Sequence, residues 1–135
     1  MSVKSYDPGR VSLILFGQRM SGFADGSMIE VSRTTAARSS VAGADGEVCV
    51  VESRDDRATV KVTLLQSSVS NAILSAAEAA KTKAAFLVKD LDGASLCEAP
   101  NAWVTKPADF KRGKELAEVE WELEVDHVRI THAGL

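Results

Sequence analysis

The sequence predicts a mainly β domain with a single helix, because its hydrophobic pattern has period 2 almost everywhere and changes once. Over most of the chain apolar and polar residues alternate, as expected for strands that bury one face. Between residues 69 and 80 the apolar residues recur at helical spacing instead. A chain of 135 residues can form one substantial core, so we treat residues 1–135 as one domain.

The first half reads as a polar lead-in, residues 1–10, followed by strands. These are predicted over residues 11–16, 28–33, 47–52 and 58–65, with Asp-Gly turn signals at 25–26 and 45–46. Residues 34–45 are rich in Ser, Thr, Ala and Gly, which predicts a long loop or an irregular β-extension. Loops of this length in compact domains are usually functional, and Arg33 and Arg38 give this one a basic character.

The second half begins with the helix, which is expected to run to about Lys81 after several possible N-caps among residues 67–70. Three shorter strands follow, over residues 85–89, 94–98 and 102–106, separated by Asp92-Gly93 and Pro100-Asn101. Residues 107–113 are predicted to form a turn. After residue 127 the apolar phase changes, which indicates a bulge, a change of sheet or a partner's surface.

The last long strand has the most informative pattern. From Ala117 onward apolar residues face one side, and Glu118, Glu120, Glu122 and Glu124 face the other. Neighbouring carboxylates on this face lie about 7 Å apart and repel by roughly 0.6 kcal/mol per pair in water. A strand that needed only solubility would usually include lysines, so we interpret these four residues, the acidic ladder, as a surface meant to be negative. An ordinary solvated outer face is the alternative.

Composition and motifs exclude several functional classes. The net charge of −3 does not favour tight binding of nucleic acid or acidic membranes. The longest apolar run, residues 11–16, is far shorter than the ~20 residues that span a bilayer, and no signal-peptide pattern begins the chain, so folding in a cytosol is expected. Cys49 and Cys97 form no CxxC pair and are expected to be buried free thiols.

Nothing in the sequence indicates catalysis, a metal or a cofactor. His127 and His132 are the only histidines, and neither has a spaced ligand partner. Asp126 and His127 are strand neighbours, which point to opposite faces and therefore cannot form a dyad there. The faintly calcium-like Asp90, Asp92 and Gly93 lack the bidentate Glu that such a loop requires. We therefore expect a non-enzymatic assembly protein.

Three segments in the central part of the chain, the first and second separated by a predicted strand, resemble those of a known family. They are Gly43-Ala-Asp-Gly-Glu47, Thr59-Val-Lys-Val-Thr-Leu-Leu65, and Gln66-Ser-Ser-Val-Ser-Asn-Ala-Ile-Leu74. In this order they resemble the tail tube proteins of long-tailed bacteriophages, and more narrowly the small structural protein family of contractile-tailed phages. The element order is similar over residues 10–130, and the motifs are specific over residues 43–74. The Glu-rich last strand departs from the family pattern.

This resemblance implies a fold like that of phage tail tubes and the type VI secretion tube. Two antiparallel sheets would pack as a sandwich or split barrel with one flanking helix, and six copies would form rings that stack into a tube. We expect Lys61, Glu118, Glu120, Glu122 and Glu124 to face the lumen, where a negative wall lets DNA pass without specific binding. The loop 34–45, with Arg33, Arg38 and Asp45, would reach the next ring.

The resemblance also implies partners and a location. Besides copies of itself, the chain would contact tail sheath, tape-measure, baseplate and tail terminator proteins. It would be assembled in the host bacterial cytoplasm and reside in the virion tail. Two alternatives stay open at this point: a free-standing β-sandwich binding module that uses loop 34–45, and a tube subunit of a phage-like secretion or injection system.

Overall fold

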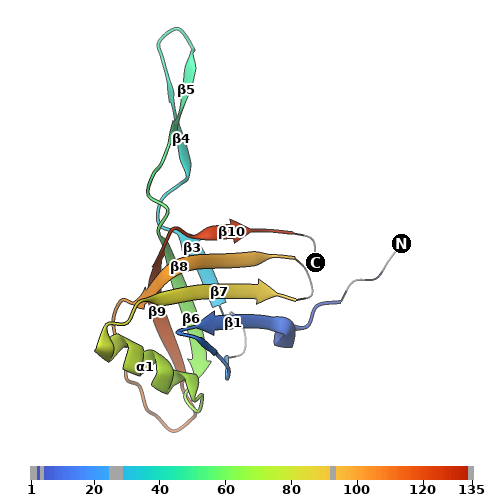
Figure 1. Cartoon of the computed structure of the whole chain (residues 1–135), viewed down its shortest axis with the longest axis vertical. Coiled ribbons are helices and arrows are strands. Elements are labelled where there is room, and N and C mark those ends of the chain that lie inside the picture. Colours follow the sequence, from blue (N-terminus) through green and yellow to red (C-terminus); the bar gives the residue numbers. More distant parts are fainter. Residues whose placement is uncertain (1–2, 4, 25–28, 92–93, 134–135) are drawn as a thin grey trace.

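The computed structural model describes residues 3, 5–24, 29–91 and 94–133, and shows a curved sheet, a projecting hairpin and a helix (Figure 1). This confirms the predicted class, which is mainly β with two antiparallel sheets and one helix. The turns predicted at Asp25-Gly26 and Asp92-Gly93 lie outside the described residues.

The larger sheet has eight strands within the described residues, in the order β2-β1-β7-β8-β9-β6-β3, and β10 pairs with β8 beside this path. A short 3-10 helix, η1, precedes β1. The bounds are η1 Pro8–Arg10, β1 Val11–Leu15, β2 Gln18–Arg19, β3 Ile29–Arg33, β6 Ala58–Leu65, β7 Ala84–Asp90, β8 Leu96–Val104, β9 Glu118–Asp126 and β10 Arg129–Thr131. In Figure 1 β1, β7 and β8 run across the view, whereas β6 and β9 cross them steeply.

One core lies between these two halves of the larger sheet. Alternate residues of β6 and β9 point into it, as the period-2 pattern predicts, and β1, β7, β8 and the helix add further side chains. Burying each large apolar side chain contributes about 1.5–3 kcal/mol. The largest fully buried members are Phe86, Leu13, Leu15, Met20, Leu64, Leu74, Leu123, Val60, Val62 and Val125.

Helix α1, Ser70–Ala80, forms where the period changes. The hydroxyl of Ser68 accepts the backbone N–H of Ser70 at 3.2 Å and so satisfies one of the free donors at the helix start. Leu74 and Ala77 are buried against the sheet. The helix ends at Lys81, whose left-handed backbone (φ +54°) lets its N–H return to the carbonyls of Ala77 and Glu78.

The two short strands predicted on either side of Pro100-Asn101 are one strand, β8. Between Ala84↔Ala102 and Phe86↔Ala99 the register with β7 shifts, so β8 holds an extra residue there. Proline cannot donate to a sheet ladder and is tolerated at a bulge. Pro100 therefore bends this strand without ending it, and the predicted break was wrong.

The predicted loop 34–45 is half of a hairpin. Residues 38–42 form β4, Arg38–Ala42, which pairs with β5, Val48–Glu52, from Arg38↔Glu52 to Ala42↔Val48. We call residues 38–52 the arm; it projects from one end of the molecule (Figure 1). Val41 is the one large apolar residue on β4, which is why the sequence predicted a loop or an irregular β-extension here instead of a regular strand. Arg33, which ended the predicted strand 28–33 and was also counted among the contact residues of the loop, is the last residue of β3, opposite Ala58.

The change of apolar phase near the C-terminus marks a sharp bend. His127 has a left-handed backbone (φ +49°), after which the chain leaves β9 and runs back as β10 beside Leu96, Cys97 and Glu98 of β8. This differs from the three readings that the sequence left open, because the chain changes its pairing partner while it stays in the same sheet.

Candidate assembly surface

The acidic ladder occupies the solvent face of β9. Trp121, Leu123 and Val125 point the other way and are at most 5% exposed. Burial alternates along β9 with these residues on the inner face. The inner face fixes the strand against the core, and so it also fixes the carboxylates on the outer face.

Strand β6 supplies the neighbours of the ladder. Antiparallel pairing sets Thr59 opposite Glu124, Lys61 opposite Glu122 and Thr63 opposite Glu120. On the other side of β6, Glu30 of β3 stands opposite Lys61. Cross-strand partners on one face lie within about 5.5 Å at Cβ, so the Lys61 cation is set between two carboxylates. It lowers the mutual repulsion without removing the negative character of the face.

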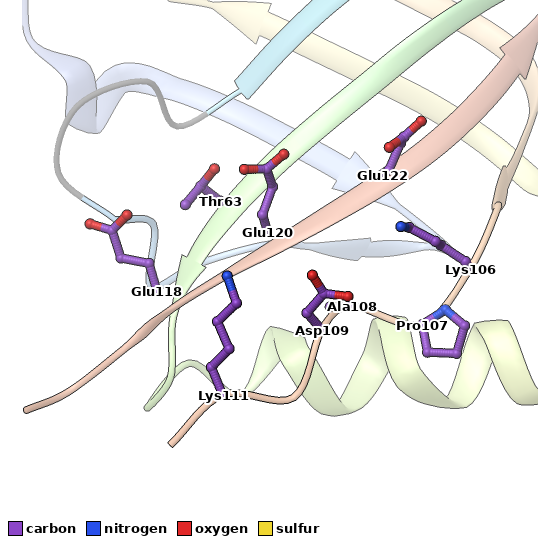
Figure 2. Close-up of a pocket in the computed structure, with 9 residues that line it drawn as sticks. All are labelled: Thr63, Lys106, Pro107, Ala108, Asp109, Lys111, Glu118, Glu120 and Glu122. Carbon is purple, nitrogen blue, oxygen red and sulfur yellow. The ribbon is translucent and has the colours of Figure 1, made fainter. Parts of the chain in front are cut away.

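The irregular segment after β8 brings two more cations to the ladder. It forms one side of a hollow of about 320 Å³, with the ladder on the other (Figure 2). Figure 2 shows the ammonium groups of Lys106 and Lys111 turned toward the carboxylates. The lining consists of Thr63, Lys106, Pro107, Ala108, Asp109, Lys111, Glu118, Glu120 and Glu122. The arrangement is that of a partly screened, exposed charged surface.

We call the segments on either side of the arm, residues 33–37 and 53–57, its root. A salt-bridge cluster joins the root to Glu124, at the end of the acidic ladder. Arg57 contacts both carboxylate oxygens of Asp55 at 2.9 Å, and its third nitrogen lies 3.3 Å from Glu124. The bidentate guanidinium holds the pKa of Asp55 down at about 2, and the Asp55 carboxylate raises the pKa of Arg57. Both charges therefore persist across the physiological pH range.

The two chain segments that enter and leave the arm are joined at its root. Arg33 donates to the carbonyl of Asp55 at 2.8 Å, and the hydroxyl of Thr35 donates to the same carbonyl at 3.2 Å. The N–H of Ser53 donates to the carbonyl of Ala37 at 2.8 Å, and Arg38 pairs with Glu52 at 3.1 Å. Since the root is attached to β3 and to the ladder, the arm leaves the sheet in a defined direction.

The residues predicted for the inter-ring loop are spread over the arm and its root. Arg33 is at the root, Arg38 begins β4, and Asp45 lies at the tip, where its carboxylate accepts the N–H of Glu47 at 3.1 Å. Cys49 was expected to be buried but is exposed in β5, because the hairpin has no layer packed on it. Cys97 is buried, as predicted, and burial raises its pKa to about 11.

Sequence reasoning missed the root cluster. Residues 53–57 were read only as a turn, although the run Asp55-Asp56-Arg57 carries the charges that fix the arm. Their partners Glu124 and His127 are about seventy residues away, so no local pattern reveals the pairing. The density of opposite charges in residues 54–57 was the one available signal.

Two kinds of feature are absent from the residues that the structure describes. No group of three or more His, Cys, Asp or Glu side chains among them is placed to hold a metal ion. No helix in this part of the chain is long and apolar enough to cross a membrane.

Comparison with solved structures finds the same fold in a chain of a virion and in chains of two structures described as tube terminators. The chain matches a chain of a structure described as the virion of a native gene transfer agent particle, with a TM-score of 0.68 at 12% identity, covering 95% of this chain and 100% of that one. It matches the anti-feeding prophage cap, described as a tube terminating cap, with a TM-score of 0.60 at 13% identity, covering 97% and 94%.

A third match is the sheath/tube terminator of an extracellular contractile injection system in its extended state. Its TM-score is 0.60 at 11% identity, and the match covers 98% of this chain and 100% of that one. No protein-family model matches the sequence. No curated protein matches it either. The likeness therefore lies in the fold, over nearly the whole length of each chain.

Proposed function

We propose that this chain is a structural subunit of a phage-type tail or contractile injection system, and that its copies assemble into hexameric rings around a channel. One observation carries the proposal: the fold matches chains of three such particles over at least 94% of both partners. The arrangement of exposed surfaces supports it, because the acidic ladder and the unpacked arm are features that a solitary domain does not need.

The acidic ladder is assigned to the channel wall. Ring closure would repeat Glu118, Glu120, Glu122 and Glu124 around the axis, with Lys61 between them and the carboxylate of Glu30. Such a wall repels phosphates, so DNA would pass without adhering. The arm, with Arg38 and Asp45, and its root residue Arg33 are assigned to contacts between rings. Further partners would be sheath, tape-measure, baseplate and terminator proteins, in a tail assembled in the host bacterial cytoplasm.

The test is direct imaging of the purified full-length chain. We expect electron microscopy to show rings with sixfold symmetry, and stacked rings at high protein concentration. Particles with fourfold or eightfold symmetry, or dimers alone, would contradict the proposal. Neighbouring genes for a sheath and a tape-measure protein provide an independent check.

A second candidate is a ring that ends the tube. It is favoured by the descriptions of two matched structures, one a tube terminating cap and the other a sheath/tube terminator. A tube subunit elongates from a seed, whereas a terminator forms single rings and stops elongation. Adding the chain to growing tubes of the same particle therefore separates the two: incorporation along the tube indicates a subunit, and arrest of growth indicates a terminator.

A further inference from the structure

The arm exposes apolar side chains that nothing in the monomer covers. Val41, Val48, Val50 and Val51 are each 48–61% exposed. Directly opposed residues of the two strands share a face, and successive residues alternate between faces. Val41 therefore lies with Cys49 on one face of the hairpin, and Val50 lies with Ser40 on the other. A two-stranded hairpin is marginally stable in water without a surface to pack on. The arm therefore needs a partner to hold it.

A complementary groove lies at the opposite end of the molecule. The segment between β8 and β9, coloured orange-brown, runs below α1 in Figure 1, far from the arm. Between this segment, α1 and β9 is a groove of about 490 Å³, lined in part by Ala72, Pro107, Ala108, Phe110, Val119 and Trp121. Phe110 is 83% exposed at its rim, and the guanidinium of Arg112 lies 4.2 Å from its ring centroid. The groove thus offers an apolar floor beside a cation.

Charge makes the two ends complementary. The arm tip, residues 43–47, carries Asp45 and Glu47 and no basic residue. The segment 106–114 carries four basic residues and a single carboxylate. Lys106 and Lys111 turn toward the acidic ladder, whereas Arg112 lies at the rim of the groove. A negative apolar hairpin therefore meets a positive apolar groove.

We propose that the arm of one copy docks in the groove between segment 106–114, α1 and β9 of a second copy, which is displaced along the long axis of the molecule. The arm cannot reach its own groove, because the two lie at opposite ends of the molecule (Figure 1). A contact between two different surfaces is heterologous, and without closure it continues from copy to copy. This inference rests on the proposed tube function and supplies the surfaces by which rings would stack.

A disulfide test uses the thiol already present on the arm. In the Phe110→Cys variant, Cys49 of one copy should meet the new thiol of the next when the contact brings their Cα atoms within about 7 Å. Every copy carries both thiols. Mild oxidation should therefore give covalent multimers of increasing size, extending beyond the hexamer, on a non-reducing gel. Buried Cys97, with its raised pKa, does not compete.

Controls make each outcome decisive. Adding Cys49→Ser to Phe110→Cys should abolish these multimers, and Lys89→Cys, at an exposed position of β7, should produce none. Cross-linked products limited to dimers, or no more cross-linked product than the wild-type chain gives, would overturn the docking. Multimers that end at six copies would place the contact within a ring and would overturn it as a stacking contact. Imaging the wild-type chain tests ring formation separately, so failure of the docking and failure of the proposed function are distinguishable.

A charge exchange tests the electrostatic part. In the Phe110→Cys background, Glu47→Arg should lower the cross-linked fraction about fivefold, and adding Arg112→Glu should restore it. Failure of the second change to restore cross-linking would contradict the proposed pairing of tip and rim.

Discussion

Asp56 and His127 join two segments that are far apart in the sequence. One carboxylate oxygen of Asp56 lies 2.9 Å from Nδ1 of His127, and the other accepts the backbone N–H of His127 at 3.2 Å. The carbonyl of Asp56 accepts the N–H of Val128 at 3.2 Å. One residue at the root of the arm thereby holds the left-handed bend between β9 and β10.

This pair predicts a pH dependence. The Asp56 carboxylate raises the pKa of His127, and the imidazole in turn lowers the pKa of Asp56. The His127 contribution to stability is complete below the ordinary His pKa of about 6.5 and is lost as pH rises through the raised value. The Asp56 contribution is complete above about 3.9 and is lost as pH falls through the lowered value. We expect the pair to stabilise the bend most between these limits.

NMR titration of the His127 imidazole checks this expectation. The midpoint should lie above 6.5 in the wild-type chain and should fall in Asp56→Asn, which keeps the shape of the side chain and removes its charge. Equal midpoints in the two proteins would show that the pair does not couple in solution.

Asn71 should be important for stability. Its side-chain oxygen accepts the indole N–H of Trp121 at 2.9 Å, and its amide donates to the carbonyl of Leu65 at 2.9 Å. Asn71→Ala leaves both groups without these partners, which should lower the free energy of unfolding by about 1–3 kcal/mol. Urea denaturation followed by tryptophan fluorescence measures this. Ser75→Ala, at an exposed position of the same helix, should change it by less than about 0.5 kcal/mol.

Gly22 should not tolerate a side chain. It has φ +75°, and an added Cβ would lie 2.6 Å from Cβ and Oγ of Ser68. Gly17 has a similar φ of +76° with open space around it, so Gly17→Ala measures the backbone cost alone, about 1–2 kcal/mol. We expect Gly22→Ala to lower the melting temperature clearly more than Gly17→Ala. Equal losses would mean that Ser68 moves aside at no cost.

The arm should open readily in the monomer and be held closed in the assembly. Within residues 38–52 every residue is exposed and the hairpin strands pair only with each other. Amide hydrogen exchange in the arm should be fast in the monomer and slow in assembled particles. Replacing residues 38–52 with a short Gly-Ser linker should leave the monomer melting temperature within about 2 °C while abolishing stacking. Slow exchange in the monomer would contradict this.

Reversing charge on the ladder should separate its two possible placements. If it lines the channel, tubes of Glu120→Lys/Glu122→Lys should still form but should retain double-stranded DNA at low salt and release it as salt is raised. Glu120→Gln/Glu122→Gln controls for loss of the carboxylates alone and should not retain DNA. Normal passage of DNA combined with loss of sheath attachment would place the ladder on the outside of the tube.

The sequence was sufficient wherever a structural property is local. Alternation along residues 117–125 predicted that Trp121, Leu123 and Val125 enter the core and that the glutamates stay outside. The change to helical spacing located α1 to within a residue or two. Both periods follow from backbone geometry, so they can be read without knowing what the element packs against.

Tertiary structure decided the features that depend on pairing between distant segments. Pro100 is compatible with a turn or a bulge, and only the register with β7 shows a bulge. Residues 38–42 are weak strand formers that become a strand because β5 pairs with them. The clusters at Asp55 and Asp56 unite residues from β9 and its end with the root of the arm. Such contacts are set by the three-dimensional path of the chain, which a periodicity along one segment does not contain.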